Sequence, residues 1–147
     1  MTTKEQPVIV EQTFKVTAKV IWDAITDINE MKLWYFENIP DFKTVVGFKT
    51  EFNVKSEDRN FLHQWEVTEV QPLKKITYRW HFKDYQGASL VHFELFTTNN
   101  ETKLSVTNEV IADFPDNIPE FKRESCLGGW NYFIKNRLKN YIEKTTK

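Results

Sequence analysis

Apolar and polar residues alternate through the middle of this chain. In the clearest run, apolar or aromatic positions interleave with polar ones: Ile76, Tyr78, Trp80 and Phe82 against Thr77, Arg79, His81 and Lys83. Because successive side chains of a strand point to opposite faces, this run predicts a strand with one buried face.

Five further segments show a strand-like pattern, so we predict six strands in all. The other five are residues 8 to 16, 48 to 54, 61 to 67, 91 to 95 and 104 to 106. Short turns containing Pro72, Gly87 or paired polar residues separate the later segments. Consecutive hairpins with one apolar face predict an antiparallel meander.

Between the first two strands the apolar residues take helical spacing. Thr17 precedes such a run over residues 18 to 25, which predicts a capped helix. Asp27 and Glu30 have the spacing of a capping box. They predict a second short helix, which would include Trp34.

The end of the chain predicts one long helix that starts near residues 117 to 119, with Pro119 in its first turn. Its apolar residues recur three or four positions apart: Leu127, Trp130, Ile134, Leu138 and Tyr141. Gly128 and Gly129 interrupt it, at a cost of about 1 kcal/mol each relative to alanine. We interpret the two glycines as a close approach of the helix backbone to the sheet.

These elements predict one α+β domain over residues 1–147, with the long helix covering the apolar face of the sheet. Composition adds that 15% of the residues are aromatic, against three His, one Cys and four Gly. His, Cys and Gly are too few here to build most catalytic or phosphate-binding sites. An aromatic sheet face under a single helix favours a pocket for an apolar small molecule.

Charge and hydropathy exclude several functions. The net charge of −1 gives no general attraction to nucleic acid, so we expect no nucleic-acid partner. We find neither an 18-residue apolar run nor a signal peptide at the start, which predicts a cytoplasmic protein without membrane insertion. The single Cys126 cannot form an internal disulfide.

Three stretches carry a resemblance to a known superfamily: residues 18–27, residues 65–80 and the Gly129-Trp130 step. They resemble the START-like or helix-grip superfamily, which includes the birch-pollen allergen. Within it they are most similar to the branch named after the activator of the ninety-kilodalton heat-shock protein's ATPase. The resemblance implies a curved antiparallel sheet of seven-stranded type that grips a C-terminal helix around a cavity. Residues 43 to 46 are the candidate for a seventh strand.

We predict that ten residues line the cavity. They are Trp34, Phe36, Phe42, His63, Trp65, Tyr78, Trp80, Phe93, Trp130 and Ile134. His63 shares a face with Trp65 and is the candidate polar anchor. Residues 36 to 47 and 112 to 118 are the expected mouth. The alternative is that these side chains fill the core completely. We predict no catalytic residue, no metal site and no cofactor.

The superfamily includes lipid carriers, hormone receptors, polyketide cyclases and co-chaperones, so several functions stay open. We favour binding of an apolar or aromatic ligand that is lipid-like or polyketide-like. A cyclase or hydratase would need two convergent buried polar groups, for which His63 and Tyr78 are the candidates. A chaperone partner would use the basic helix, through Lys135, Arg137 and Lys139. In addition, Phe114 and Phe121 could cover the pocket or form a homodimer contact. The branch's eukaryotic namesake has a separate chaperone-binding domain, which 147 residues are not expected to contain.

Overall fold

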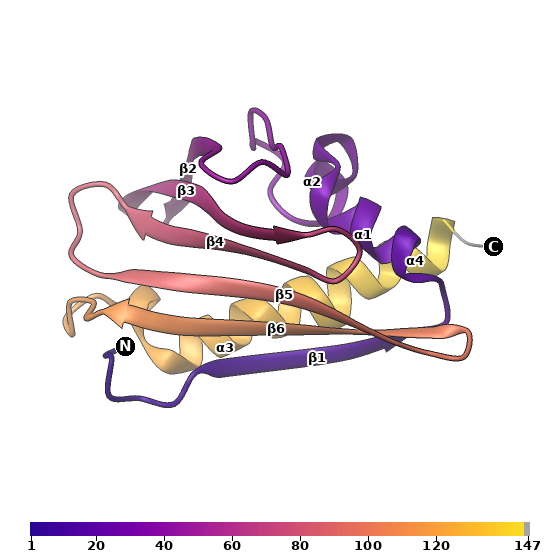
Figure 1. Ribbon diagram of the computed structural model, residues 1–147. Helices are drawn as coiled ribbons and strands as arrows, with labels where there is room; N and C mark the ends of the chain where they lie inside the picture. Colours follow the sequence, from indigo (N-terminus) through magenta and orange to yellow (C-terminus); the bar gives the residue numbers. More distant parts are fainter. Residues whose placement is uncertain (146–147) are drawn as a thin grey trace.

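The computed structural model describes residues 1–145 (Figure 1). The elements are β1 (Val8–Phe14), α1 (Ala18–Thr26), α2 (Ile28–Trp34), β2 (Lys49–Ser56), β3 (Arg59–Gln71), β4 (Lys75–Phe82), β5 (Ala88–Thr98), β6 (Glu101–Ala112), a 3₁₀ turn (Pro119–Phe121), α3 (Arg123–Trp130), a π-helical segment (Asn131–Leu138) and α4 (Lys139–Thr145). No helix among these residues is long and apolar enough to cross a membrane.

The six predicted strands are confirmed, and they form one antiparallel sheet in the order β1-β6-β5-β4-β3-β2. The candidate seventh strand at residues 43 to 46 is wrong. Val45 and Val46 are exposed, and the Phe48 amide donates to the Val45 carbonyl in a turn. Residues 43 to 46 pair with no strand of the sheet, so Val45 and Val46 remain exposed in a turn.

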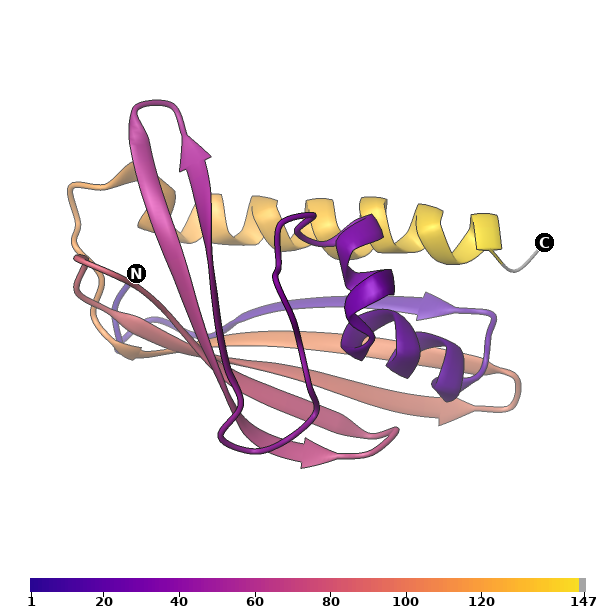
Figure 2. The same ribbon diagram turned by 90° about the horizontal axis from the view of Figure 1, so that it is seen from above.

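The sheet is curved, and the helix from α3 to α4 lies along its inner face (Figures 1 and 2). Two register irregularities interrupt the ladders, at Val67/Glu69 in β3 and at Ala88/Ser89 in β5. Such bulges bend a strand and increase its twist. α1 and α2 pack against the α4 end of the helix, which leaves the α3 end to be covered by loops (Figure 2).

The long helix keeps one row of side chains against the sheet. Trp130, Ile134, Leu138 and Ile142 are all at most 5% exposed and follow one another at four-residue spacing. In a regular α-helix this spacing drifts by about 40° per step. The wider turns of a π-helix take up that drift, which is a physical reason for the unusual segment between α3 and α4.

Two predicted details of this helix are wrong. Leu127 is 40% exposed, because it lies outside the row that faces the sheet. The continuous helix begins at Arg123, since Pro119 starts a separate 3₁₀ turn and Lys122 is extended.

The predicted capping box is also wrong. Asp27 does cap α2, accepting from the Asn29 amide. The Glu30 carboxylate, however, accepts from the Tyr141 hydroxyl at 2.7 Å and so joins α2 to α4.

Candidate ligand cavity

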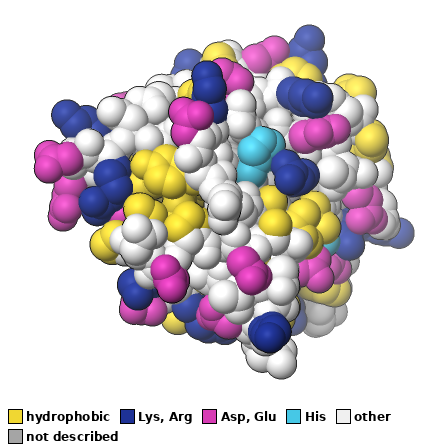
Figure 3. Space-filling model, turned by 90° about the vertical axis from the view of Figure 1, so that its left-hand side faces the viewer, with side chains coloured by type: hydrophobic (Ala, Val, Ile, Leu, Met, Phe, Trp, Pro, Cys, Tyr) yellow, Lys and Arg dark blue, Asp and Glu magenta, His cyan; other side chains and the backbone are white. Residues whose placement is uncertain are grey.

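A cavity of about 190 Å³ lies between the sheet and the first part of the long helix. The strands contribute His63, Trp80, Phe82, Ser89 and Asn108. The helix contributes Ser125, Cys126, Gly129, Trp130 and Phe133. The remaining residues come from the N-terminus, the loop after α2 and the segment between β6 and α3: Met1, Phe36, Phe114, Glu120 and Phe121. Figure 3 views the molecule from the left-hand side of Figure 1, where hydrophobic side chains reach the surface in groups between charged ones.

The structure divides the ten predicted site residues into two sets. Phe36, His63, Trp80 and Trp130 line the cavity. The other six lie outside its lining and are buried in the filled core: Trp34, Phe42, Trp65, Tyr78, Phe93 and Ile134. Periodicity identifies the inward face of a strand, but it does not tell which stretch of that face lies under packed helices.

Hydrogen bonds show how tightly the filled part is built. The Trp34 Nε1 donates to the Ala24 carbonyl at 2.7 Å. The hydroxyls of Tyr35 and Tyr78 are bonded at 2.9 Å, and burial raises the pKa of both. Tyr78 is thus bound to another side chain and outside the cavity lining, so the convergent pair that we predicted with His63 is not formed.

Sequence reasoning left the residues of the helix start out of the predicted lining. Phe114 and Phe121 were candidates to cover the pocket, although loop residues carry no periodic signal. The small residues Ser125, Cys126 and Gly129 did leave a trace, as a run of small side chains where a covering helix should be bulky. Such a run opposite an aromatic sheet is the signal that could have located the cavity.

Our interpretation of the two helix glycines is wrong. A Cβ added at either Gly128 or Gly129 would meet no heavy atom within 4 Å, beyond the backbone of its own helix. Gly129 lines the cavity, whereas Gly128 is exposed and does not. The backbone therefore does not touch the sheet there, and the missing side chain of Gly129 leaves the space open.

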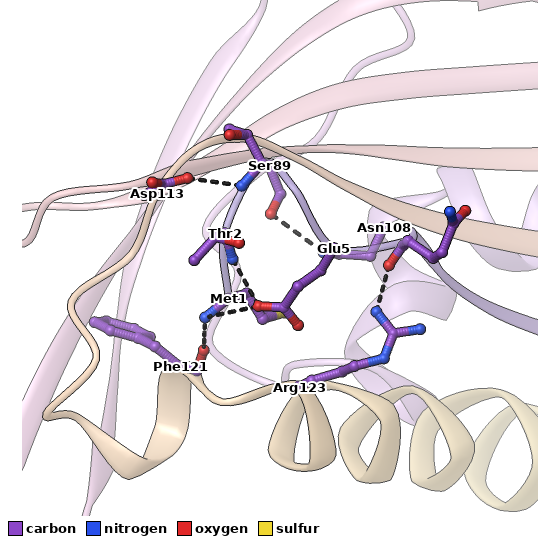
Figure 4. Close-up of polar contacts among 10 residues, drawn as sticks. Met1, Thr2, Glu5, Ser89, Asn108, Asp113, Phe121 and Arg123 are labelled. Atoms are coloured by element: carbon purple, nitrogen blue, oxygen red, sulfur yellow. Dashed lines mark hydrogen bonds and ion pairs between the residues drawn. The ribbon is translucent and has the colours of Figure 1, made fainter.

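Polar side chains cross the inner face of the sheet along the cavity. His63, Trp80, Ser89 and Asn108 come from β3, β4, β5 and β6 in turn. Trp80 and Ser89 are register partners, and the Asn108 Nδ2 donates to the Ser89 Oγ at 3.2 Å (Figure 4). The rings of His63 and Trp80 have centroids 5.3 Å apart. We call these four residues the polar band.

Two nitrogens of the polar band are unpaired. His63 Nδ1 and Trp80 Nε1 are buried and have no hydrogen-bond partner among the described residues. Burial lowers the pKa of His63 to about 3, so its imidazole is neutral near pH 7. Burial also raises the pKa of the Cys126 thiol to about 11, which makes it a poor nucleophile.

An ion pair closes one side of the cavity. Arg59, at the start of β3, donates from Nε and Nη2 to the two carboxylate oxygens of Glu120 at 2.9 and 3.0 Å. Ser56, at the end of β2, donates to the same carboxylate at 2.8 Å. We call these three residues the latch. It joins the tip of the β2–β3 hairpin to the 3₁₀ turn, near the start of the long helix (Figure 2).

The first residues of the chain close a second side (Figure 4). The Met1 amino nitrogen donates to the Phe121 carbonyl at 2.8 Å, and the Phe114 amide donates to the Met1 carbonyl at 2.9 Å. Phe114 and Phe121 are 6% and 3% exposed and pack with Phe61 in a small cluster of their own. Of the two roles open for Phe114 and Phe121, they take that of covering the pocket. Of the two segments expected at the mouth, 112 to 118 contributes Phe114 to the cavity lining and 36 to 47 contributes Phe36.

Gly87 allows this cluster to form. Its φ is +106°, and a Cβ there would lie 2.4 Å from the Phe114 ring. Any other residue would meet both backbone strain and a steric clash at this turn.

Several solved structures are similar to this chain. DynU16, a protein from the dynemicin biosynthetic locus, is 22% identical with a TM-score of 0.75, over 96% of this chain and 48% of DynU16. The chain thus spans about half the length of DynU16. MLL2253 from Mesorhizobium loti is 25% identical with a TM-score of 0.76, over 97% and 100% of the two chains. The Aha1 dimer from Colwellia psychrerythraea is 19% identical with a TM-score of 0.73, again over 97% and 100%.

A comparison with curated proteins found no match. The solved structures confirm the helix-grip fold. The sequence model of one family, Activator of Hsp90 ATPase homolog 1-like protein, matches residues 15–143, which is most of the chain. The protein therefore belongs to the family of Activator of Hsp90 ATPase homolog 1-like proteins.

Proposed function

We propose that this protein binds a small, largely apolar molecule in the cavity between the sheet and the start of the long helix. The observation that carries the proposal is the cavity itself, about 190 Å³ of unfilled space walled mainly by aromatic rings. The walls are mostly apolar, and apolar surface in contact with water is unfavourable. A bound apolar molecule would remove that surface from water.

The volume limits the size of the ligand. Sites for drug-sized molecules span roughly 300 to 1,000 Å³. An apolar cavity of about 150 Å³ holds a benzene molecule. A compound with one ring, or a short chain, fits the space better than the lipid-like or polyketide-like molecules that the sequence suggested. The origin of DynU16 in a biosynthetic locus is in keeping with a role that involves a small molecule.

The two glycines provide a matched test. Gly129→Leu would place a side chain in the cavity, whereas Gly128→Leu places the same side chain on the exposed face of the same turn. Cys126 is the only cysteine and lines the cavity, so its modification by methyl methanethiosulfonate reports access. Toluene and phenol serve as probe ligands that should slow the modification.

We expect at least one probe to protect Cys126 in the wild type and in Gly128→Leu, and neither to protect it in Gly129→Leu. If neither probe protects the wild type at saturating concentration, the proposal is wrong. Equal protection in both leucine variants would place the binding elsewhere. Native mass spectrometry of gently purified protein would then identify any natural ligand that is retained.

No specific observation favours the other two functions. The pair of His63 and Tyr78 that a cyclase or hydratase would use is not formed, because Tyr78 is bonded to Tyr35. Two of the three helix cations that a chaperone would contact hold the fold together instead. Lys135 donates to the Glu11 carbonyl and Arg137 to the Leu33 carbonyl.

A further inference from the structure

We infer that the ligand is an uncharged molecule with a hydroxyl group, which binds against Trp80 and His63. This inference rests on the proposed function and adds the chemical class of the compound. It is carried by the position of two unpaired nitrogens in the polar band.

Both nitrogens lack a partner in a place where partners are nearly always found. His63 is only 7% exposed, and neither His63 Nδ1 nor Trp80 Nε1 has an acceptor or donor among residues 1–145. Buried polar groups are almost always hydrogen-bonded, and an unpaired one costs stability. Both nitrogens are shielded by their neighbours, and both side chains line the cavity, so a change of ring orientation would be needed for a molecule inside to reach them.

The donors and acceptors of the two rings select a hydroxyl. An indole N–H can only donate, so Trp80 requires an acceptor. A neutral imidazole has one nitrogen that donates and one that accepts. A hydroxyl has both a hydrogen and lone pairs, so it can serve Trp80 and either form of His63. The two rings are neighbours, with centroids 5.3 Å apart, and both line the cavity, so one bound molecule can meet both.

The charges around the cavity argue against an ionised ligand. Within the described lining, the charged groups are the Glu120 carboxylate and the Met1 amino group. Glu120 already binds Arg59 and Ser56. The Met1 nitrogen already donates to the Phe121 carbonyl and lies 4.0 Å from the Glu5 carboxylate. A carboxylate in this space would lose its water without gaining a free cation, which is costly.

The test compares phenol, toluene and benzoate, which have similar rings and differ in the polar group. Dissociation constants come from the protection of Cys126 against methyl methanethiosulfonate. The ratio of phenol affinity to toluene affinity is the decisive quantity, because changes in cavity size affect both compounds alike. Trp80→Phe removes the indole N–H and keeps an aromatic ring, and His63→Phe removes both imidazole nitrogens.

Trp65→Phe is the matched control. Trp65 Nε1 is also buried and unpaired, and its ring lies 5.1 Å from that of Trp80, but Trp65 does not line the cavity. We expect Trp80→Phe and His63→Phe each to lower the phenol-to-toluene ratio about tenfold, the effect of one lost hydrogen bond to a buried group. Trp65→Phe should leave the ratio unchanged, and benzoate should bind more weakly than phenol.

A measurement on the unaltered protein makes the inference independent of whether the variants fold. Phenol should shift the indole N–H proton resonance of Trp80, and toluene should not shift it to the same field. If toluene and phenol both protect Cys126 but the ratio is the same in all variants, the inference is wrong and the proposed function stands. Tighter binding of benzoate than of phenol would likewise overturn it. If none of the compounds protects Cys126, both proposals fail.

Discussion

His63 shows how a single side chain can connect the cavity to stability. It lies on the inner face of β3, where its ring stacks on Phe52 with centroids 5.1 Å apart and meets Phe82 at 4.8 Å. Aromatic neighbours on these sides exclude water and provide no counter-charge. Burial is the cause of its lowered pKa, about 3 against the ordinary value of 6.5.

This pKa predicts that the protein loses stability in acid. Between pH 6.5 and about 3 the unfolded chain binds a proton at His63 that the folded chain does not bind. Stability therefore falls as the pH falls through this window, by up to about 1.4 kcal/mol per pH unit from this residue. Urea unfolding of the wild type and of His63→Phe at several pH values checks the prediction.

The His63→Phe protein should lose less stability across the same window, because its carboxylates titrate as before while the histidine contribution is gone. Parallel pH profiles for the two proteins would show that His63 is not buried in the neutral form. Above pH 7 the profiles should run parallel, which serves as the internal control.

At the scale of elements, the sequence predicts the strands better than the helices. Each strand from β2 to β6 carries its own alternation, so its existence and inward face could be read from the pattern alone. The long helix depends on contacts that the pattern does not contain. Its buried residues, four positions apart, fit a widened helix. Its start at Arg123 depends on the 3₁₀ turn that Pro119 begins and on the extended backbone of Lys122.

The β2–β3 hairpin is the element whose role depends most on a distant contact. Arg59 and Glu120 are 61 residues apart in the chain, and nothing in their local sequence marks them as partners. The two side chains are 31% and 21% exposed, so solvent screens their ion pair and its contribution to overall stability is small. Its effect should thus appear in access to the cavity more than in overall stability.

We predict that Arg59→Ala, which opens the latch, increases the modification rate of Cys126 about fivefold. The reason is that the loss of a solvent-screened ion pair raises the population of an open hairpin by about that factor. Methyl methanethiosulfonate kinetics measure the rate. Lys19→Ala is the control, because it breaks an exposed ion pair with Asp23 on α1 and should leave the rate unchanged. Equal rates in Arg59→Ala and the wild type would mean that the probe enters by another route.

At the scale of the whole molecule, the inner face of the sheet has a filled part and an open part. The filled part includes Trp34, Tyr78, Phe93 and Ile134, and the open part faces α3. The sequence predicted His63, Trp80 and Trp130 because they lie on elements whose inward faces it identified, whereas Phe36 lies in the loop after α2. It could not predict where the filled part of the inner face ends, since that depends on how far α1 and α2 extend over the sheet and on loops such as the one that carries Phe114.

This division predicts unequal costs for the same substitution at two phenylalanines. Phe93 is 1% exposed in the filled part, and Phe93→Ala should cost about 3–5 kcal/mol of unfolding free energy. Phe133 is half-buried and lines the cavity, so its ring already borders open space. Phe133→Ala should cost clearly less, and it should enlarge the cavity enough to admit a second ring.

Urea unfolding measures the two costs, and protection of Cys126 by 1-naphthol measures the change in size. Phe133→Ala should bind 1-naphthol more tightly than the wild type does, with phenol as the reference compound. If Phe133→Ala is as destabilised as Phe93→Ala, the wall around Phe133 is packed like the rest of the core. If its affinity for 1-naphthol is unchanged, Phe133 does not limit the cavity. Ligand size would then be set by the latch and by the segments that carry Met1, Phe114 and Phe121, which are held both by hydrogen bonds and by the small cluster around Phe61.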